Sequence, residues 1–224
     1  MTGGGPRYEA AGKRPAPEEL LLEVRKERIE EVLALRTRNL TVVLDRLEDT
    51  FNMAAVLRTC EGMGVQEVHV IRNPEVPFRP NAKVTQGCDK WLDITVHEDF
   101  GACSRTLKAR GFSLWASAVQ PQSESLFELR FDGKVALVFG NERYGVSSEV
   151  LAGADAKFWI PMRGFTRSFN ISAAVSASIT HAIGWRIEHL GQAGDMAPDE
   201  LQALRERFHL LSVKQRGRIY PPET

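Results

Sequence analysis

Three polar segments carry the side chains of this chain that are best suited to chemistry. The first, "DRLEDTFNMAAVLR", contains Asn52 and, six residues later, Arg58. The second, "FGNERYGVS", contains Gly140 and Glu142, and the third is "RGFTRSFNIS", Arg163–Ser172. Amide, guanidinium, carboxylate and hydroxyl groups orient polar substrates, hold phosphates and move protons. Each segment alone is also typical of a surface turn, so its meaning depends on where the fold places it.

The periodicity of apolar residues predicts an α/β domain with a mainly parallel sheet and helices on both faces. Strands are expected at residues 40–45, 65–71, 90–96, 112–119, 134–140 and 158–162. Helices are expected at residues 17–35, 51–64, 100–110, 147–154 and 168–190, with a last one starting near Pro198. All three polar segments follow expected strands. In open α/β sheets, ligands collect beyond the carboxyl ends of the strands.

The expected organisation is a central domain with short additions at both ends. Residues 1–17 are rich in glycine and proline and predict a disordered tail. Residues 18–38 predict an N-terminal helical extension, 39–190 the main domain, and 191–224 a basic C-terminal helical extension. No apolar run approaches the roughly 18–20 residues of a membrane span, and the polar N-terminus lacks a signal-peptide core. A soluble, cytoplasmic protein is therefore expected.

Charge gives only a local indication of a nucleic-acid partner. Of 224 residues 26% are charged, and the formal net charge is zero. The stretch 204–218 nevertheless carries five basic side chains against Glu206 alone: Arg205, Arg207, Lys214, Arg216 and Arg218. Such a face binds phosphate even on a neutral protein. On charge alone, a solvated helix tail is an equally good interpretation.

Cysteine and histidine usage does not indicate a metal site. The cysteines, at positions 60, 88 and 103, are too few and too scattered for a disulfide framework or a CxxC motif. Cys60 falls in a helical apolar pattern, which favours a small core residue over a reactive thiol. The five histidines do not occur at metal-ligand spacing, so no metal is expected.

A Rossmann-type nucleotide site is not expected. That site needs GxGxxG directly after the first strand. Here the first strand is followed by "RLEDTFN", which has no glycine, and "EGMGV" lies at a helix end, where glycine is simply a C-cap. A NAD enzyme and a methyltransferase of the Rossmann kind are therefore both disfavoured.

Three stretches resemble the motifs of a known family: "NMAAVLRTCEGMGV", "ALVFGNERYGVS" and "IPMRGFTRSFNISAAVSASI". They are similar, in order and in spacing, to the three motifs of the SpoU/TrmH branch of the SPOUT RNA 2′-O-ribose methyltransferases. The resemblance covers about residues 40–184. It implies a homodimer and a C-terminal trefoil knot whose threaded loops bind S-adenosylmethionine. The segments "NLTVVLDRLED" and "GCDKWLDI" and the helical ends resemble most the branch members that methylate guanosine-18 in the tRNA D-loop.

The resemblance also implies roles for particular residues. The catalytic positions would be Asn52, Arg58, Glu142, Ser168 and Asn170. The cofactor pocket would be lined by Ser117, Gly140, Ile160, Met162 and Phe169. Candidates for RNA contact are Lys90, Arg163, Arg167, Arg205, Lys214, Arg216 and Arg218. Relatives mostly carry leucine in place of Phe169, and many are uncharged at the two arginines of the third segment. Trp91 is better explained as a core residue than as a base-stacking platform.

Methyl transfer to a ribose needs the 2′-hydroxyl to be held in line with the methyl group and to lose a proton. Arg58 is the family's candidate base, but neutralising a guanidinium at pH 7 costs about 8–9 kcal/mol. Our hypothesis is that Arg58 clamps a substrate phosphate bidentately, while the proton leaves to that phosphate, to water or to a transiently perturbed guanidine. Asn52 would fix Arg58 or the ribose. Helix capping is the alternative for Asn52, Ser168 and Asn170, and a surface position is the alternative for Arg58 and Glu142.

Two other functions stay open at this point. Another tRNA position or ribosomal RNA is the main competitor as substrate, and a non-catalytic RNA-binding module is the weaker one. The roughly 39 residues before the first strand are too few for an L30-like RNA-binding domain, which favours tRNA.

Overall fold

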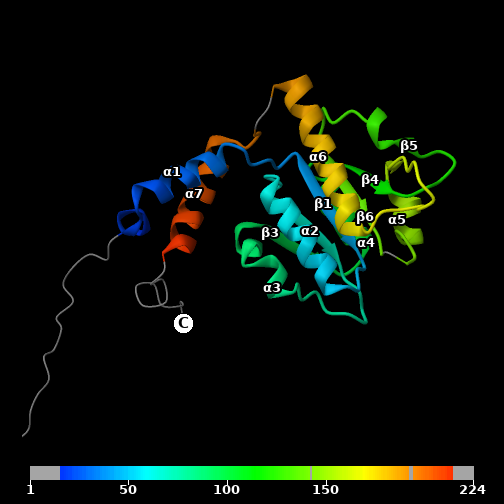
Figure 1. Ribbon diagram of the computed structural model, residues 1–224, viewed down its shortest axis with the longest axis horizontal. Coiled ribbons are helices and arrows are strands. Elements are labelled where there is room, and N and C mark those ends of the chain that lie inside the picture. Colours follow the sequence, from blue (N-terminus) through cyan, green and yellow to red (C-terminus); the bar gives the residue numbers. More distant parts are fainter. Residues whose placement is uncertain (1–15, 142, 192–193, 214–224) are drawn as a thin grey trace, which may run out of the picture.

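The computed structural model describes residues 16–141, 143–191 and 194–213, and it is built around one seven-stranded sheet (Figure 1). All the strand pairs are parallel, and the order is β3-β2-β1-β6-β4-β7-β5. The strands are β1 (Leu40–Asp45), β2 (Glu67–Ile71), β3 (Asp93–His97), β4 (Ser113–Ser117), β5 (Glu124–Ser125), β6 (Val135–Phe139) and β7 (Ala156–Trp159). The predicted α/β fold with a mainly parallel sheet is confirmed.

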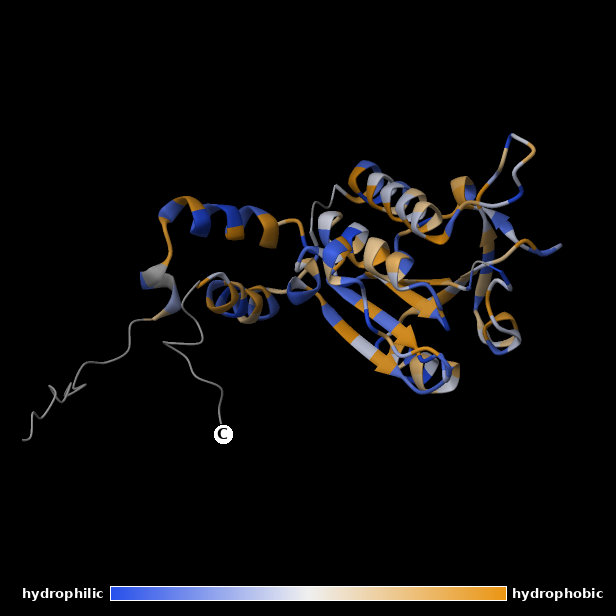
Figure 2. Ribbon diagram, turned by 60° about the horizontal axis from the view of Figure 1, so that its bottom comes forward, coloured by the Kyte–Doolittle hydropathy of each residue, from blue (hydrophilic) through white to orange (hydrophobic). Residues whose placement is uncertain are grey.

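Helices cover both faces of the sheet, as predicted (Figures 1 and 2). The α-helices are α1 (Glu23–Leu33), α2 (Thr50–Gly62), α3 (Ala82–Thr85), α4 (Phe100–Lys108), α5 (Ser148–Gly153), α6 (Ile171–Leu190) and α7 (Pro198–Ser212). Short 3-10 helices occur at Pro17–Leu20, Cys88–Trp91 and Leu126–Glu128. On one face, α2 and α6 pack on Val42 and Leu137; on the other, α4 and α5 pack on Val43 and Val138.

The centre of the sheet explains where ligands can collect. β1 and β6 are buried along their whole length and pair from Leu40↔Val135 to Leu44↔Phe139. Continuous apolar strands of this kind need cover on both faces. The middle of the sheet is therefore mostly apolar, and a polar side chain there, such as Thr41, is buried and hydrogen-bonded within the sheet. The exposed polar loops begin where the strands end. The loops after β1, β6 and β7 all leave at the same edge of the sheet.

α1 and α7, which lie far apart in the sequence, form a small helical unit beside the sheet. Figure 1 shows α1 and α7 side by side, and they share an apolar cluster of Ile29, Leu33, Leu204 and Phe208. This cluster is separate from the two that flank the sheet. α1 and α7 lie within the segments for which helical extensions were predicted, and they pack on each other. The division into a main domain and two extensions stays a prediction. The predicted tail falls almost entirely outside the described residues.

Several predicted boundaries were wrong for identifiable reasons. The helix expected at 17–35 is interrupted: a 3-10 turn precedes α1, and Val24, expected in the apolar stripe, is 76% exposed. The strand expected from residue 90 begins at Asp93, because the preceding residues form a 3-10 turn against α7. α3 and the two-residue strand β5 were not expected.

The knot stays a prediction, since strand order alone does not establish how the chain is threaded. Among the described residues, no helix combines the length and the apolar character that crossing a membrane requires.

One buried ion pair joins the end of α6 to the start of β1. Arg186, 5% exposed, donates to the carbonyl of Phe131 at 3.0 Å and pairs with Asp195 at 2.9 Å. The other oxygen of Asp195 accepts the backbone N–H of Arg38 at 2.8 Å. The pair therefore ties the segment after α6 to the strand at the centre of the sheet.

We predict that Arg186→Met lowers the free energy of unfolding by about 3–5 kcal/mol, because it leaves the Asp195 charge buried without its partner. Arg130→Met is the matched control, since the Arg130–Asp132 pair is exposed on both sides and such pairs contribute at most about 1 kcal/mol. Urea denaturation followed by circular dichroism measures both. Equal losses in the two variants would contradict the anchoring role of Arg186.

Candidate functional site

A pocket of about 270 Å³ lies at the carboxyl ends of β4, β6 and β7. Its lining includes all five residues expected to bind a cofactor: Ser117, Gly140, Ile160, Met162 and Phe169. They come from three strand exits that are separated along the chain and adjacent in the sheet. Ser168 and Arg167 also line it. The third polar segment thus forms one wall of this pocket.

Part of the pocket lining is a tight loop in which the backbone of Gly140 lies against that of Gly145 and Val146. A Cβ on Gly140 would lie 2.1 Å from the carbonyl carbon of Gly145 and 2.2 Å from the nitrogen of Val146, so only glycine fits. The loop is closed by the Gly145 N–H, which donates to the carbonyl of Asn141 at 2.7 Å. Gly145 itself has a φ of +72°, which favours glycine. Glu142, the expected catalytic carboxylate of this loop, lies outside the described residues.

Beside the pocket, the starts of α2 and α6 meet. The side-chain amide of Asn170 donates to the side-chain oxygen of Asn52 at 3.2 Å, across 118 positions of sequence. The structure therefore brings together the asparagines of the first and third motifs. α2 and α6 also pack along their length, with the hydroxyls of Thr59 and Ser176 3.0 Å apart.

Helix capping was the alternative role for Asn52, Ser168 and Asn170, and the structure shows it for Asn170 but not for Asn52. Asp49, not Asn52, caps α2 by accepting the N–H of Phe51 at 2.7 Å, so the capping interpretation of Asn52 was wrong. Asn170 does cap α6, accepting the N–H of Ser172 at 2.9 Å. Ser168 lies two residues before that cap and faces the pocket. Capping by Asn170 and its contact with Asn52 use different atoms and are compatible.

Arg58 is not brought into the pocket. It is exposed on α2, six residues or about 9 Å of helix rise beyond Asn52. Within the described part of the chain, neither residue belongs to the pocket lining.

The RNA-contact candidates divide into three groups. Arg163 and Arg167 are exposed on the segment that forms the pocket wall. Arg205 makes a two-pronged ion pair with Glu30 at 2.6 and 2.8 Å, which joins α7 to α1 and gives it a structural partner. Lys90 is exposed, and its ammonium lies 4.6 Å from the ring centroid of Trp91. Lys214, Arg216 and Arg218 lie outside the described residues.

Trp91 packs where the sheet domain meets the helical ends. Its ring contacts Phe208 edge-on, with centroids 5.0 Å apart, which supports the packing interpretation. The ring also forms part of a basic pocket of about 170 Å³, whose arginines are Arg25, Arg28 and Arg36. Arg36 is 1% exposed and pairs with Glu61 at 2.8 Å. Sequence reasoning missed this pocket, although the i, i+3 spacing of Arg25 and Arg28 on one helix face is a usable signal.

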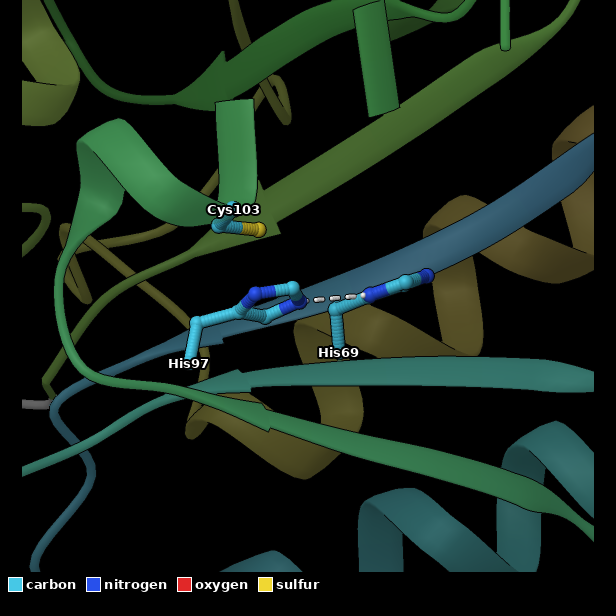
Figure 3. Close-up of side chains that lie close together, drawn as sticks. All are labelled: His69, His97 and Cys103. Carbon is cyan, nitrogen blue, oxygen red and sulfur yellow. Dashed lines mark hydrogen bonds between the residues drawn. The ribbon is translucent and has the colours of Figure 1, made fainter. Parts of the chain in front are cut away.

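Two histidines that are far apart in the sequence meet on the other face of the sheet. Nδ1 of His69 and Nε2 of His97 are 2.9 Å apart, and the thiol of Cys103 lies beside them (Figure 3). Burial, with a contribution from Asp45, raises the pKa of the Cys103 thiol to about 12. Sequence spacing did not indicate this cluster. Cys60 is fully buried between α2 and the sheet, as its apolar pattern predicted.

Comparisons with known proteins identify the family of this chain. Residues 39–180 match the sequence profile of the SpoU rRNA Methylase family. A tRNA (guanosine(18)-2′-O)-methyltransferase of Thermus thermophilus is 37% identical over 166 residues, which are 74% of this chain and 85% of that protein. The crystal structure of the Aquifex aeolicus TrmH/SpoU tRNA modifying enzyme superposes with a TM-score of 0.77 at 30% identity, covering 85% of this chain and 98% of that one.

A third comparison concerns the fold alone. The SpoU methyltransferase AviRb from Streptomyces viridochromogenes, solved in complex with the cofactor AdoMet, is 22% identical with a TM-score of 0.62, covering 70% of this chain and 64% of that one. The profile match spans more than half of the chain and contains all three polar segments. The chain belongs to the SpoU family of RNA methylases.

Proposed function

We propose that this protein transfers a methyl group from S-adenosylmethionine to the ribose 2′-hydroxyl of a guanosine in tRNA, and that the guanosine is residue 18 of the D-loop. The observation that carries the proposal is the pocket formed by all five expected cofactor residues, directly beside the Asn52–Asn170 pair. The Thermus relative, which covers most of this chain, is named for this reaction.

The lining of the pocket suits the chemistry of the cofactor. Its walls combine the apolar side chains of Ile160, Met162 and Phe169 with exposed backbone at the Gly140 turn. Apolar side chains suit an adenine ring, and backbone N–H and C=O groups give the ring's polar edge its hydrogen bonds. Phe169 is 46% exposed, so its ring has surface left to cover a ligand. Bound S-adenosylmethionine supplies an electrophilic sulfonium methyl group.

The residues of this chain orient the other reactant. The side chains of Asn52 and Asn170 are hydrogen-bonded to each other at the starts of α2 and α6. Because the two helices pack together, the backbone at both residues has a defined position. Ser168 reaches the pocket from the adjoining wall. We assign these three, together with Glu142, to positioning the ribose, and Arg58 to clamping a substrate phosphate. Fixing two reactants in line accounts for much of the rate of such a transfer.

Methylation of defined RNAs tests the proposal. Tritiated S-adenosylmethionine is incubated with a tRNA transcript, with the same tRNA carrying 2′-deoxyguanosine at position 18, and with ribosomal RNA. We expect label in the first only, because the second lacks the accepting hydroxyl. Label that persists with the deoxy substrate, or that appears in ribosomal RNA alone, overturns the guanosine-18 assignment while leaving methyl transfer intact. Binding of tRNA without label in any substrate supports the non-catalytic alternative.

Replacement of Arg58 by lysine tests the phosphate clamp. An ammonium keeps the charge but loses the planar fork that binds two phosphate oxygens. We predict that Arg58→Lys lowers kcat by about 100-fold or more, because small misplacements of a reacting group have effects of this size, and leaves the affinity for S-adenosylmethionine unchanged. Arg72→Lys, on an exposed surface pair with Glu98, is the control and should retain activity. Nearly full turnover by Arg58→Lys contradicts the clamp.

We propose that the RNA is held by local basic groups. Arg163 and Arg167 stand at the pocket wall, and Arg25 and Arg28 line the basic pocket beside Trp91. Lys90 lies next to the same ring, and the tail with Lys214, Arg216 and Arg218 follows α7 in sequence. Of the predicted RNA contacts we retain Lys90, Arg163, Arg167, Lys214, Arg216 and Arg218, and we give Arg205 its structural role with Glu30. Arg25 and Arg28 are additions from the structure. A tRNA substrate also suits the cytoplasmic location expected from the sequence.

We propose further that the protein is a homodimer. Support comes from the outer face of α6, where Ala173, Thr180, Gly184 and Ile187 are exposed on one side of the helix. Small side chains let another helix approach closely, and Ile187, 53% exposed, adds apolar area.

A large charged side chain on this face should separate the protomers. A Cβ on Gly184 meets nothing within 4 Å, so Gly184→Arg is tolerated by the single chain. We predict a monomer for Gly184→Arg and a dimer for the wild type by light scattering after size exclusion. Gly62→Arg is the matched control, since Gly62 is also exposed and unobstructed at a helix end. A Gly184→Arg variant that stays dimeric excludes this face.

A further inference from the structure

The cluster of His69, His97 and Cys103 unites three elements on the face of the sheet opposite α2 and α6. His69 lies on β2, His97 ends β3, and Cys103 lies on α4. One ligand atom from each, a ring nitrogen or the sulfur, lies within 4.8 Å of the others, and all three residues are buried (Figure 3). The register pairs His97 with Ile71, so the two histidines stand on the same face, one step apart.

We propose that these three residues form a structural site for a zinc ion. Imidazole nitrogen and thiolate are preferred zinc ligands, bound at about 2.0–2.1 and 2.3 Å, so the donor atoms of a tetrahedral site lie roughly 3.3–3.6 Å apart. The histidine nitrogens are now 2.9 Å apart. Side-chain rotations that move the donor atoms by about an ångström, without movement of the strands, bring the cluster to that geometry.

The surroundings of His69 match those of a metal ligand. Its Nδ1 points to His97, while its Nε2 lies 3.7 Å from a carboxylate oxygen of Glu67 and has no hydrogen-bond partner among the described residues. Glu67 is held as a carboxylate by ion pairs with Arg38 and Arg110. The negative charge of Glu67 on this side of the ring favours a proton at Nε2, which leaves Nδ1, the nitrogen that faces His97, free to coordinate.

A negative charge to balance the ion is also present. Asp45 ends β1, is 1% exposed, and its Oδ1 has no hydrogen-bond partner in the described part of the chain. Its other oxygen accepts the N–H of Ser147 at 2.7 Å. On coordination the Cys103 thiol releases its proton to solvent, and the thiolate and Asp45 together neutralise the dication. A water molecule completes the tetrahedron.

The site would fasten α4 to the edge of the sheet and takes no part in methyl transfer. The cofactor pocket is lined from β4, β6 and β7, whereas the cluster sits on β2, β3 and α4. Zinc binding at the cluster is therefore independent of the proposed reaction.

Metal content of the untagged full chain tests the site. The protein is treated with chelator, dialysed against zinc chloride and assayed by mass spectrometry, with zinc affinity from a competing chromophore. We expect about one zinc per chain, and a loss of affinity of at least about 100-fold in Cys103→Val, which removes the sulfur at similar volume. Cys88→Ser is the matched control and should bind like the wild type. Absence of zinc from the wild type, or unchanged affinity in Cys103→Val, overturns the proposal.

Cobalt substitution decides the matter if Cys103→Val fails to fold. In wild type and Cys88→Ser, Co²⁺ should show the intense thiolate charge-transfer band and the visible absorption of a tetrahedral centre. A cobalt complex without the thiolate band excludes Cys103 as a ligand and overturns the site.

Discussion

The close approach of Gly140 to Gly145 and Val146 is the constraint on which the site depends. β6 lies at the centre of the sheet and is buried on both faces. The backbone after its last residue, Phe139, is therefore the nearest part of this segment that can contact a ligand. The loop turns back on itself so tightly that a Cβ at residue 140 would meet backbone at 2.1 Å. Backbone thus forms the floor of the pocket, and the walls follow from the neighbouring exits of β4 and β7. A site of this kind recognises a ligand by shape and main-chain hydrogen bonds.

The contact between α2 and α6 buries part of the core and also places two candidate site residues, Asn52 and Asn170, next to each other. The helices pack against one face of the sheet, and their first turns carry Asn52 and Asn170 into contact. Asn170 serves twice, as the cap of α6 and as the partner of Asn52. Because Asp49 caps α2, the side chain of Asn52 is not required as the cap of its own helix, which suits a role toward the substrate. A substitution at Asn170 would disturb both the cap and the contact, whereas one at Asn52 would leave the caps in place.

Much of the sheet and the pocket could be predicted because local patterns determine them. The apolar run at 134–140 indicates a buried parallel strand. Gly140, which ends this run, was expected in the cofactor pocket only because of the resemblance to a family. The resemblance to a family supplied what patterns cannot, namely that Ser117, Ile160 and Phe169 meet in one pocket. Contacts between distant segments were missed: the meeting of His69, His97 and Cys103 depends on strand register and on the position of α4. The exposure of Val24 was missed because an interrupted helix changes which face points inward.

The exposed position of Arg58 bears on how the proton leaves the ribose. A general base must reach within hydrogen-bond distance of the hydroxyl that it deprotonates. Arg58 lies outside the pocket lining, about 9 Å along α2 from Asn52. A guanidinium at that distance is badly placed for a proton on the reacting oxygen, but it is suitably placed for the phosphate of a bound RNA chain, which extends beyond the ribose. If Arg58 clamps a phosphate, as we propose, the bound RNA chain itself would connect Arg58 to the pocket, whose lining does not include this residue.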